Sequence, residues 1–157
     1  MSIRIKSDAF GPGERIPTKY SQDGENVSPA LQFENVPSDA QALALIVDDP
    51  DAPTPEPYVH WVMYGIPGDV QGLPEGVTVG PKPDQPAGAL QGTNSAGNVG
   101  YDGPAPPKGH GTHHYHFKVY ALGSEVDLPA EADKDTVLEA IKDRILDEGE
   151  LVGTYER

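Results

Sequence analysis

The sequence predicts a mostly β protein, an antiparallel sandwich-like fold with one helix near the C-terminus and long loops rich in glycine and proline. Short apolar or alternating runs of strand length recur along the chain, and only one segment has a clear helical period. The chain also holds 18 glycines and 17 prolines, which interrupt regular structure. Short strands with a single helix favour packed antiparallel sheets. We expect one domain over residues 1–157, because this length can bury a single core.

The clearest strand patterns lie in the first half of the chain. Residues 1–5 alternate weakly and predict an edge strand, and residues 31–33 alternate into a short strand. Residues 39–47 predict a strong strand that ends in a continuous apolar run, as in a strand buried on both faces. Residues 58–66 predict the next strand. Together these segments supply much of the predicted sheet core.

Residues 67–111 are dominated by glycine and proline and show no helical period. Long irregular segments in a compact domain are usually either functional or disordered. This one contains apolar anchors such as Leu73, Leu90 and Tyr101. We therefore expect ordered loops with short strands that line a site.

The stretch over residues 100–122 starts as a Gly/Pro loop and becomes a strand where histidine and tyrosine are densest. Side chains alternate between the two faces of a strand. One face therefore carries His113, Tyr115, Phe117 and Val119, and the other carries His114, His116, Lys118 and Tyr120. The first face is apolar at its far end and polar beside the loop. This pattern is typical of a strand that runs from a core into the mouth of a pocket.

The predicted helix begins after Asp133, a plausible N-cap, with Asp135 in its first turn. Gly149 is its expected C′ residue. The helix would bury one apolar stripe, made of Val137, Leu138, Ile141, Ile145 and Leu146. Residues 151–155 predict a final strand.

Carboxylates cluster where the predicted strand over residues 39–47 ends. Asp48, Asp49 and Asp51 follow the apolar run, and His60 lies near the start of the next strand. A carboxylate beside a histidine fixes its tautomer and favours the imidazolium. An aspartate can also simply cap a turn, and we take Asp48 as structural. The sequence leaves both roles open for the other two.

The charge balance narrows the classes of partner. The chain has 25 acidic against 11 basic residues, a net charge of −14, which disfavours nucleic acid and anionic membranes. The scattered acids favour a surface adapted to high salt, with an ordinary acidic protein as the alternative. Without cysteine, no disulfide framework is predicted. Residues 1–10 lack the apolar core of a signal peptide, so we expect a cytoplasmic protein without stable membrane insertion.

Several separated motifs then point to a known family. DPDAP at 49–53, HW at 60–61, GYDGPAPPKG at 100–109 and HHY at 113–115 occur in the order typical of the phosphatidylethanolamine-binding proteins. The chain resembles this family, above all its bacterial and archaeal branch called Raf-kinase-inhibitor-like. Residues 16–33 and 149–157 are similar to that branch as well. The resemblance implies a β-sheet core with a pocket at one end and a small helical contribution near the C-terminus.

The resemblance also implies which residues bind the ligand. Carried over motif by motif, the site residues are Asp49, Asp51, Ala52, Pro53, His60, Pro107, His113 and Tyr115. The tyrosine hydroxyl, the histidines and loop N–H groups are donors that can hold a phosphoryl or carboxylate group without lysine or arginine. The resemblance therefore implies a small anionic ligand and no cofactor.

The chain departs from the family pattern at some of these motifs. Tyr58 stands where the eukaryotic branch often has tryptophan, and His114 replaces the usual arginine. By alternation His114 points away from the pocket. The replacement therefore affects only an ion pair that the arginine would make on the opposite face of the strand. Ser95 and Ala96 replace an aspartate and an aromatic residue of many relatives. The contacts of that loop are therefore not carried over.

Other functions remain open at this point. His114 and His116 share a strand face and, with nearby carboxylates, resemble a weak zinc site, although their spacing matches no specific one. His60, Asp49 and Ser95 suggest a hydrolase triad, but the chain has no G-x-S-x-G motif. We expect no catalytic turnover. The main alternative is an inhibitor-like protein that binds a kinase or protease, with a pocket that is regulatory or vestigial. In either case we expect a monomer or a homodimer.

Overall fold

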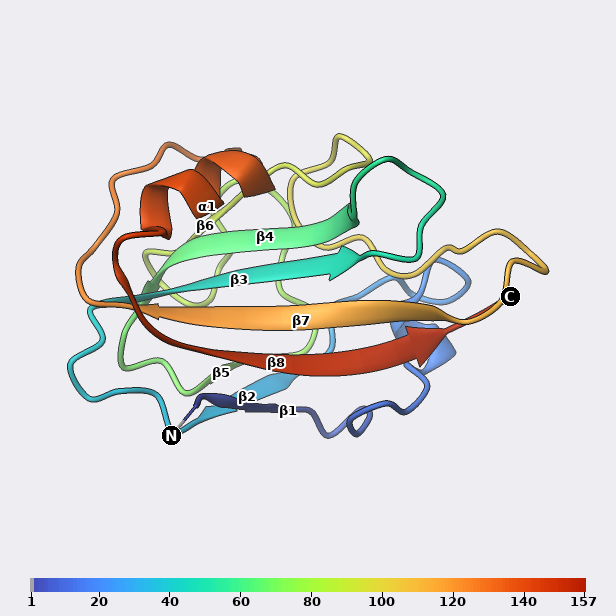
Figure 1. The fold of residues 1–157 in the computed structure, drawn as a ribbon, viewed down its shortest axis with the longest axis horizontal. Helices are drawn as coiled ribbons and strands as arrows, with labels where there is room; N and C mark the ends of the chain where they lie inside the picture. The colour runs from blue at the N-terminus through green and yellow to red at the C-terminus, as the bar shows by residue number, and fades with distance from the viewer. Residues whose placement is uncertain (1) are drawn as a thin grey trace.

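The computed structural model describes residues 2–157 and contains two antiparallel sheets (Figure 1). The large sheet has the strand order β6-β4-β3-β7-β8. In chain order its strands are β3 (Ala42–Asp49), β4 (Tyr58–Pro67), β6 (Leu90–Gln91), β7 (His113–Leu122) and β8 (Ile145–Tyr155). The small sheet has the order β1-β2-β5, with β1 (Arg4–Lys6), β2 (Leu31–Glu34) and β5 (Gly72–Leu73). The predicted mostly β, antiparallel class is confirmed.

The central strand β3 shows how the layers are built. All eight of its residues are buried, because alternate side chains enter two different cores. Leu45 and Val47 pack in the core between the two sheets, with residues of β1 and β2. Ile46 packs on the other face with Val137 and Ile141 of the helix α1 (Lys134–Ile141). The continuous apolar run in the sequence therefore indicated a strand covered on both sides (Figure 1).

The smaller elements also follow their patterns. The edge strand predicted at residues 1–5 is β1, although Met1 lies outside the described residues. Residues 67–111 contain β5 and β6, so the short strands predicted in this segment are present. A short 3-10 helix (Thr18–Tyr20) follows β1. None of the helices formed by the described residues has the length and apolar character that a membrane crossing requires.

The predicted length of the helix is wrong. It begins as expected, with the Asp133 side chain accepting a hydrogen bond from the Thr136 N–H at 2.9 Å, but it ends at Ile141. Ile145 instead starts β8, which pairs with β7 from Leu122 to His113. A helix continued to Glu148 would leave Tyr120, Ala121 and Leu122 at the end of β7 without their partners in β8, which is costly in a sheet.

The predicted end of the apolar stripe and the predicted glycine cap are wrong for the same reason, because these residues belong to β8. Ile145 and Leu146 are 36% and 45% exposed, so the buried stripe stops at Ile141. Gly149 lies inside β8 opposite Val119. A Cβ atom there would lie 2.1 Å from the backbone oxygen of Ile3. Gly149 therefore serves a close approach of two chain segments, and not the end of a helix.

Asp48 lies on the helix side of β3 and is buried. Its carboxylate is 2.8 Å from the Lys134 ammonium, and the Lys118 ammonium lies 4.0 Å away. This pair joins the N-terminus of α1 to the large sheet, which agrees with the structural role expected for Asp48.

Replacing Lys134 by alanine should lower the free energy of unfolding by about 3 kcal/mol, because it leaves a buried carboxylate without its nearest counter-charge. Lys142→Ala is the matched control, since the Lys142–Glu139 pair is exposed and should contribute about 0.5 kcal/mol or less. Urea denaturation of both variants measures the difference. Equal losses in the two variants would contradict the assignment of Asp48 as a buried ionic anchor.

Candidate functional site

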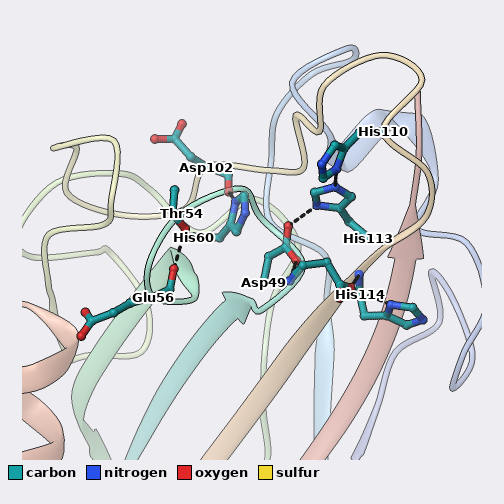
Figure 2. A network of polar contacts seen from close by, with 9 residues as sticks. Asp49, Thr54, Glu56, His60, Asp102, His110, His113 and His114 are labelled. Atoms are coloured by element: carbon teal, nitrogen blue, oxygen red, sulfur yellow. Dashed lines mark hydrogen bonds and ion pairs between the residues drawn. The ribbon is translucent and has the colours of Figure 1, made fainter.

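A cavity of about 330 Å³ lies at one end of the large sheet. Because β3 runs antiparallel to both β4 and β7, its C-terminal end meets their N-terminal ends, with Asp49 opposite Tyr58 and Asp48 opposite His116. This register brings the DPDAP, HW and HHY motifs together (Figure 2). The predicted site residues that line the cavity are Asp49, Ala52, Pro53, His60, Pro107, His113 and Tyr115.

Asp51 is the predicted site residue that does not line the cavity. Its carboxylate accepts a hydrogen bond from the backbone N–H of His114 at 2.8 Å and lies 2.7 Å from His114 Nδ1. Burial opposes ionisation of Asp51, but the hydrogen bonds from His114 outweigh it and the pKa of Asp51 is lowered. The turn after β3 thus sends Asp49 and Asp51 to opposite sides of β7. His114 therefore pairs with the Asp51 carboxylate on the opposite face of β7, the face on which the family's arginine would make an ion pair.

Asp49 and His113 form a buried pair in the cavity wall. The Asp49 carboxylate lies 2.6 Å from His113 Nδ1, and both side chains are about 97% buried or more. The second carboxylate oxygen accepts a hydrogen bond from the Asp51 N–H. On its other side, His113 Nε2 lies 2.6 Å from Nδ1 of His110, an exposed loop residue. A carboxylate and two imidazoles therefore form a chain from the core to the surface (Figure 2).

His60 is held in one tautomer. Its Nδ1 lies 2.8 Å from the carbonyl oxygen of Asp102, and a carbonyl only accepts, so Nδ1 carries the proton of the neutral ring. Burial lowers the pKa of His60 below its usual value, and the hydrogen bond to the Asp102 carbonyl only partly opposes this shift. The neutral ring therefore offers Nε2 as an acceptor.

The Tyr115 hydroxyl completes the polar lining. Burial raises the pKa of Tyr115, so the hydroxyl stays protonated and can donate. Tyr115 meets the His60 ring edge-on, with centroids 5.1 Å apart. Every fully buried side-chain nitrogen and oxygen among the described residues has a hydrogen-bond partner, but the structure gives none to the Tyr115 hydroxyl or to His60 Nε2. These two atoms therefore remain accessible.

Asp102 fixes the loop that positions His60. Its carboxylate accepts hydrogen bonds from the side-chain amides of three asparagines, Asn26, Asn94 and Asn98. Its backbone carbonyl is then free to hold His60. Sequence reasoning missed both Asp102 and His110, although Asp102 lies inside the GYDGPAPPKG motif and His110 directly follows it.

The hydrolase and zinc arrangements are not formed. Asp49 pairs with His113 and not with His60, and the Ser95 hydroxyl accepts a hydrogen bond from the Val59 N–H. His116 faces Glu150 at 3.2 Å, whereas His114 faces Asp51. Within residues 2–157, no three or more His, Cys, Asp or Glu side chains are grouped as metal ligands.

A larger, more open groove of about 830 Å³ adjoins the cavity and shares Thr54 and Tyr58 with it. It runs from the loop before β4 to the start of α1, and its lining contains none of the predicted site residues. A binding site is usually a concave pocket with a few convergent polar groups. The smaller cavity meets that description better, so we take it as the candidate site.

Comparisons with known proteins find relatives along almost the whole chain. A family model described as phosphatidylethanolamine-binding protein matches residues 6–156. The chain is 46% identical to a UPF0098 protein of Methanothermobacter thermautotrophicus, over 99% of both chains, and 41% identical to one of Aquifex aeolicus, over 99% of this chain and 89% of that protein.

Solved structures are similar over the same length. The crystal structure of Escherichia coli YbcL, described as a member of the mammalian PEBP family, superposes with a TM-score of 0.92 at 30% identity, over 100% of this chain and 99% of that one. A carboxypeptidase Y inhibitor solved with its cognate proteinase has a TM-score of 0.54 at 20% identity, over 99% and 83% of the two chains. The second comparison shows the fold alone.

Proposed function

This chain belongs to the phosphatidylethanolamine-binding protein family, and from that membership we propose that it reversibly binds a small anion, a phosphoryl or carboxylate group, in the cavity at the end of the large sheet. The observation that carries the proposal is the Tyr115 hydroxyl, a protonated donor without a partner in the protein. A bound oxyanion would accept its hydrogen bond.

The histidines are the only cationic side chains among the described residues that line the cavity, because no lysine or arginine lines it. His60 Nε2 accepts in the neutral ring and donates once the ring is protonated. His113 is paired with Asp49, so a proton on His113 neutralises the carboxylate beside it. Anion binding is therefore coupled to proton uptake in this proposal.

The remaining predicted residues have supporting roles. Ala52, Pro53 and Pro107 shape the wall, and neither proline has a backbone N–H to offer the ligand. Asp51 is assigned to holding His114 on the outer face, so we propose no ligand contact for it.

We propose binding and not turnover, because the nearby threonine and serine hydroxyls form hydrogen bonds to the backbone. Thr54 donates its hydroxyl hydrogen to the Glu56 carbonyl, and the Ser95 hydroxyl bonds to the Val59 N–H. Neither is hydrogen-bonded to a histidine that could activate it.

Tyr115→Phe should weaken the binding of methyl phosphate about tenfold or more, since it removes one hydrogen bond to a charged group and leaves the ring in place. Calorimetric titration of the ligand measures the loss. Tyr120→Phe is the matched control, because Tyr120 lies on the opposite face of the same strand, half-buried.

Equal losses in the two variants, or no loss in Tyr115→Phe, would place the anion elsewhere. If the wild-type protein binds neither methyl phosphate nor acetate, the partner-binding alternative takes precedence. In that role the same cavity would be regulatory or vestigial.

A further inference from the structure

Both ring nitrogens of His113 are occupied in the structure. Nδ1 faces the Asp49 carboxylate and Nε2 faces Nδ1 of His110, each at 2.6 Å. The two imidazole rings lie 4.8 Å apart between centroids, tilted by 53°. An anion in the cavity therefore finds no free nitrogen on His113 while His110 stays in place (Figure 2).

We propose that His110 is an internal competitor for the anion site, whose Nδ1 takes the hydrogen-bonding position on His113 that a bound anion would occupy. This inference rests on the proposed function and adds a residue and a displacement step to it. When the anion binds, it accepts the Nε2–H of His113, and His110 leaves with its loop.

The possible protonation states of the two rings show that an anion can replace the contact between His110 and His113. Two facing imidazole nitrogens share a single hydrogen, so one must donate and the other accept. If the imidazolium is on His113, its two N–H groups point at Asp49 and at His110, and an oxyanion can replace His110 as the second acceptor. If His113 is neutral, Nε2 accepts from His110. If both rings are protonated, two N–H groups meet and the like charges repel.

The charged groups around the pair come from several elements. Asp49, at the end of β3, lies beside His113 of β7, and Lys108 lies in the same loop as His110. Arg157 lies beside the loop but is paired with Asp23 at 2.8 Å. Asp51 and His114 pair with each other on the opposite face of β7. The Arg157 side chain is thus already paired with Asp23, and the competition for His113 is between His110 and the ligand.

The loop that carries His110 can leave with little disruption. Residues 107–112 are exposed. The two glycines that flank His110, Gly109 and Gly111, have φ angles of 74° and 97°, and a Cβ atom at either would meet nothing within 4 Å. The backbone ties are the Gly109 N–H to the Arg157 carbonyl and the His110 N–H to the Pro107 carbonyl, both at 3.1 Å. Displacing His110 breaks few contacts besides its bond to His113.

The test compares His110→Ala with wild type by calorimetric titration of methanesulfonate at pH 6.5, a ligand that does not titrate there. Without the competitor, binding should be about fivefold tighter, which corresponds to one hydrogen bond of about 1 kcal/mol that no longer has to be broken. His114→Ala is the matched control, because His114 is exposed and pairs with Asp51 on the other face of β7. The affinity of this variant for methanesulfonate should stay within about twofold of wild type.

A second readout follows the imidazole nitrogens by NMR in the wild-type protein. Saturating methanesulfonate should shift the His110 signals towards those of a free histidine while His113 stays hydrogen-bonded. Equal or weaker binding by His110→Ala, or His110 signals that do not move, would overturn the competition and leave the anion site standing. Absence of binding in every variant would overturn the proposed function and the competition with it.

Discussion

Methanesulfonate should bind this protein roughly tenfold to a hundredfold more tightly at pH 5.5 than at pH 8.0. The described residues that line the cavity include no lysine or arginine, so a cation in direct contact with the ligand there is a histidine. Burial lowers the pKa of His60, and the neutral ring offers the ligand only a lone pair. A bound anion stabilises the imidazolium, so the pKa of His60 is higher in the complex than in the free protein.

The sign of the pH dependence follows from these two states. Affinity is highest below the pKa of His60 in the free protein and falls as pH rises through the higher pKa of the complex. One hydrogen bond to a charged partner contributes about 1.5–3 kcal/mol, which corresponds to the expected change in affinity. If backbone and tyrosine donors alone held the anion, affinity would hardly change, because methanesulfonate itself does not titrate in this range.

Calorimetric titration at both pH values measures this effect in wild type and in His60→Asn. The variant should lose most of the pH dependence. His116→Asn is the control, since His116 lies on the other face of β7 beside Glu150. Equal affinity at the two pH values in wild type would refute the imidazolium model. If the affinity of His60→Asn still depends on pH, the imidazolium that binds the anion is on His113 or its partner His110.

Protein stability without the anion should follow the opposite trend, which provides an internal check. The pKa of His60 is lowered in the folded state, so the unfolded chain binds its proton more tightly. The contribution of the neutral ring is present above the unfolded value of about 6.5 and is lost as pH falls towards the folded value. Acid therefore weakens the free protein at this residue and strengthens the complex.

Much of the candidate site could be predicted because it depends on strand order. Alternation placed His113 and Tyr115 on the inner face of β7, and the apolar run of β3 placed Asp49 at its end. Once β3 lies between β4 and β7, these residues and His60 must meet. Asp51 was harder to place, because it follows Pro50 in the turn, where strand alternation no longer fixes the direction of a side chain.

The parts that could not be predicted depend on long-range contacts. Ile145 and Leu146 continue the helical stripe in the sequence, but in the structure they belong to β8, where pairing with the edge of β7 decides their conformation. Asp102 orients His60 through its backbone carbonyl, a group that every residue has, while its carboxylate is held by Asn26, far away in the chain. His110 acts through the conformation of a glycine-flanked loop, which leaves no periodic signal.

Trp61→Ala should lower the free energy of unfolding by about 3–5 kcal/mol, the largest stability effect that we expect from one side chain. Trp61 is fully buried in β4 and meets the Tyr101 ring edge-on, with centroids 5.4 Å apart. Its indole N–H donates to the Gln91 side-chain oxygen at 2.7 Å. The Gln91 amide in turn donates to the carbonyls of Thr78 and Gly80, so Trp61 links the sheet to the long Gly/Pro loops.

Trp61→Phe separates the two parts of this effect. Phenylalanine keeps much of the apolar packing but leaves the buried Gln91 oxygen without a donor, which should cost about 1–3 kcal/mol. Urea denaturation of both variants measures the losses. If Trp61→Phe is as stable as wild type, the hydrogen bond to Gln91 does not hold the loops. If Trp61→Phe loses as much as Trp61→Ala, that polar contact outweighs the packing of the ring.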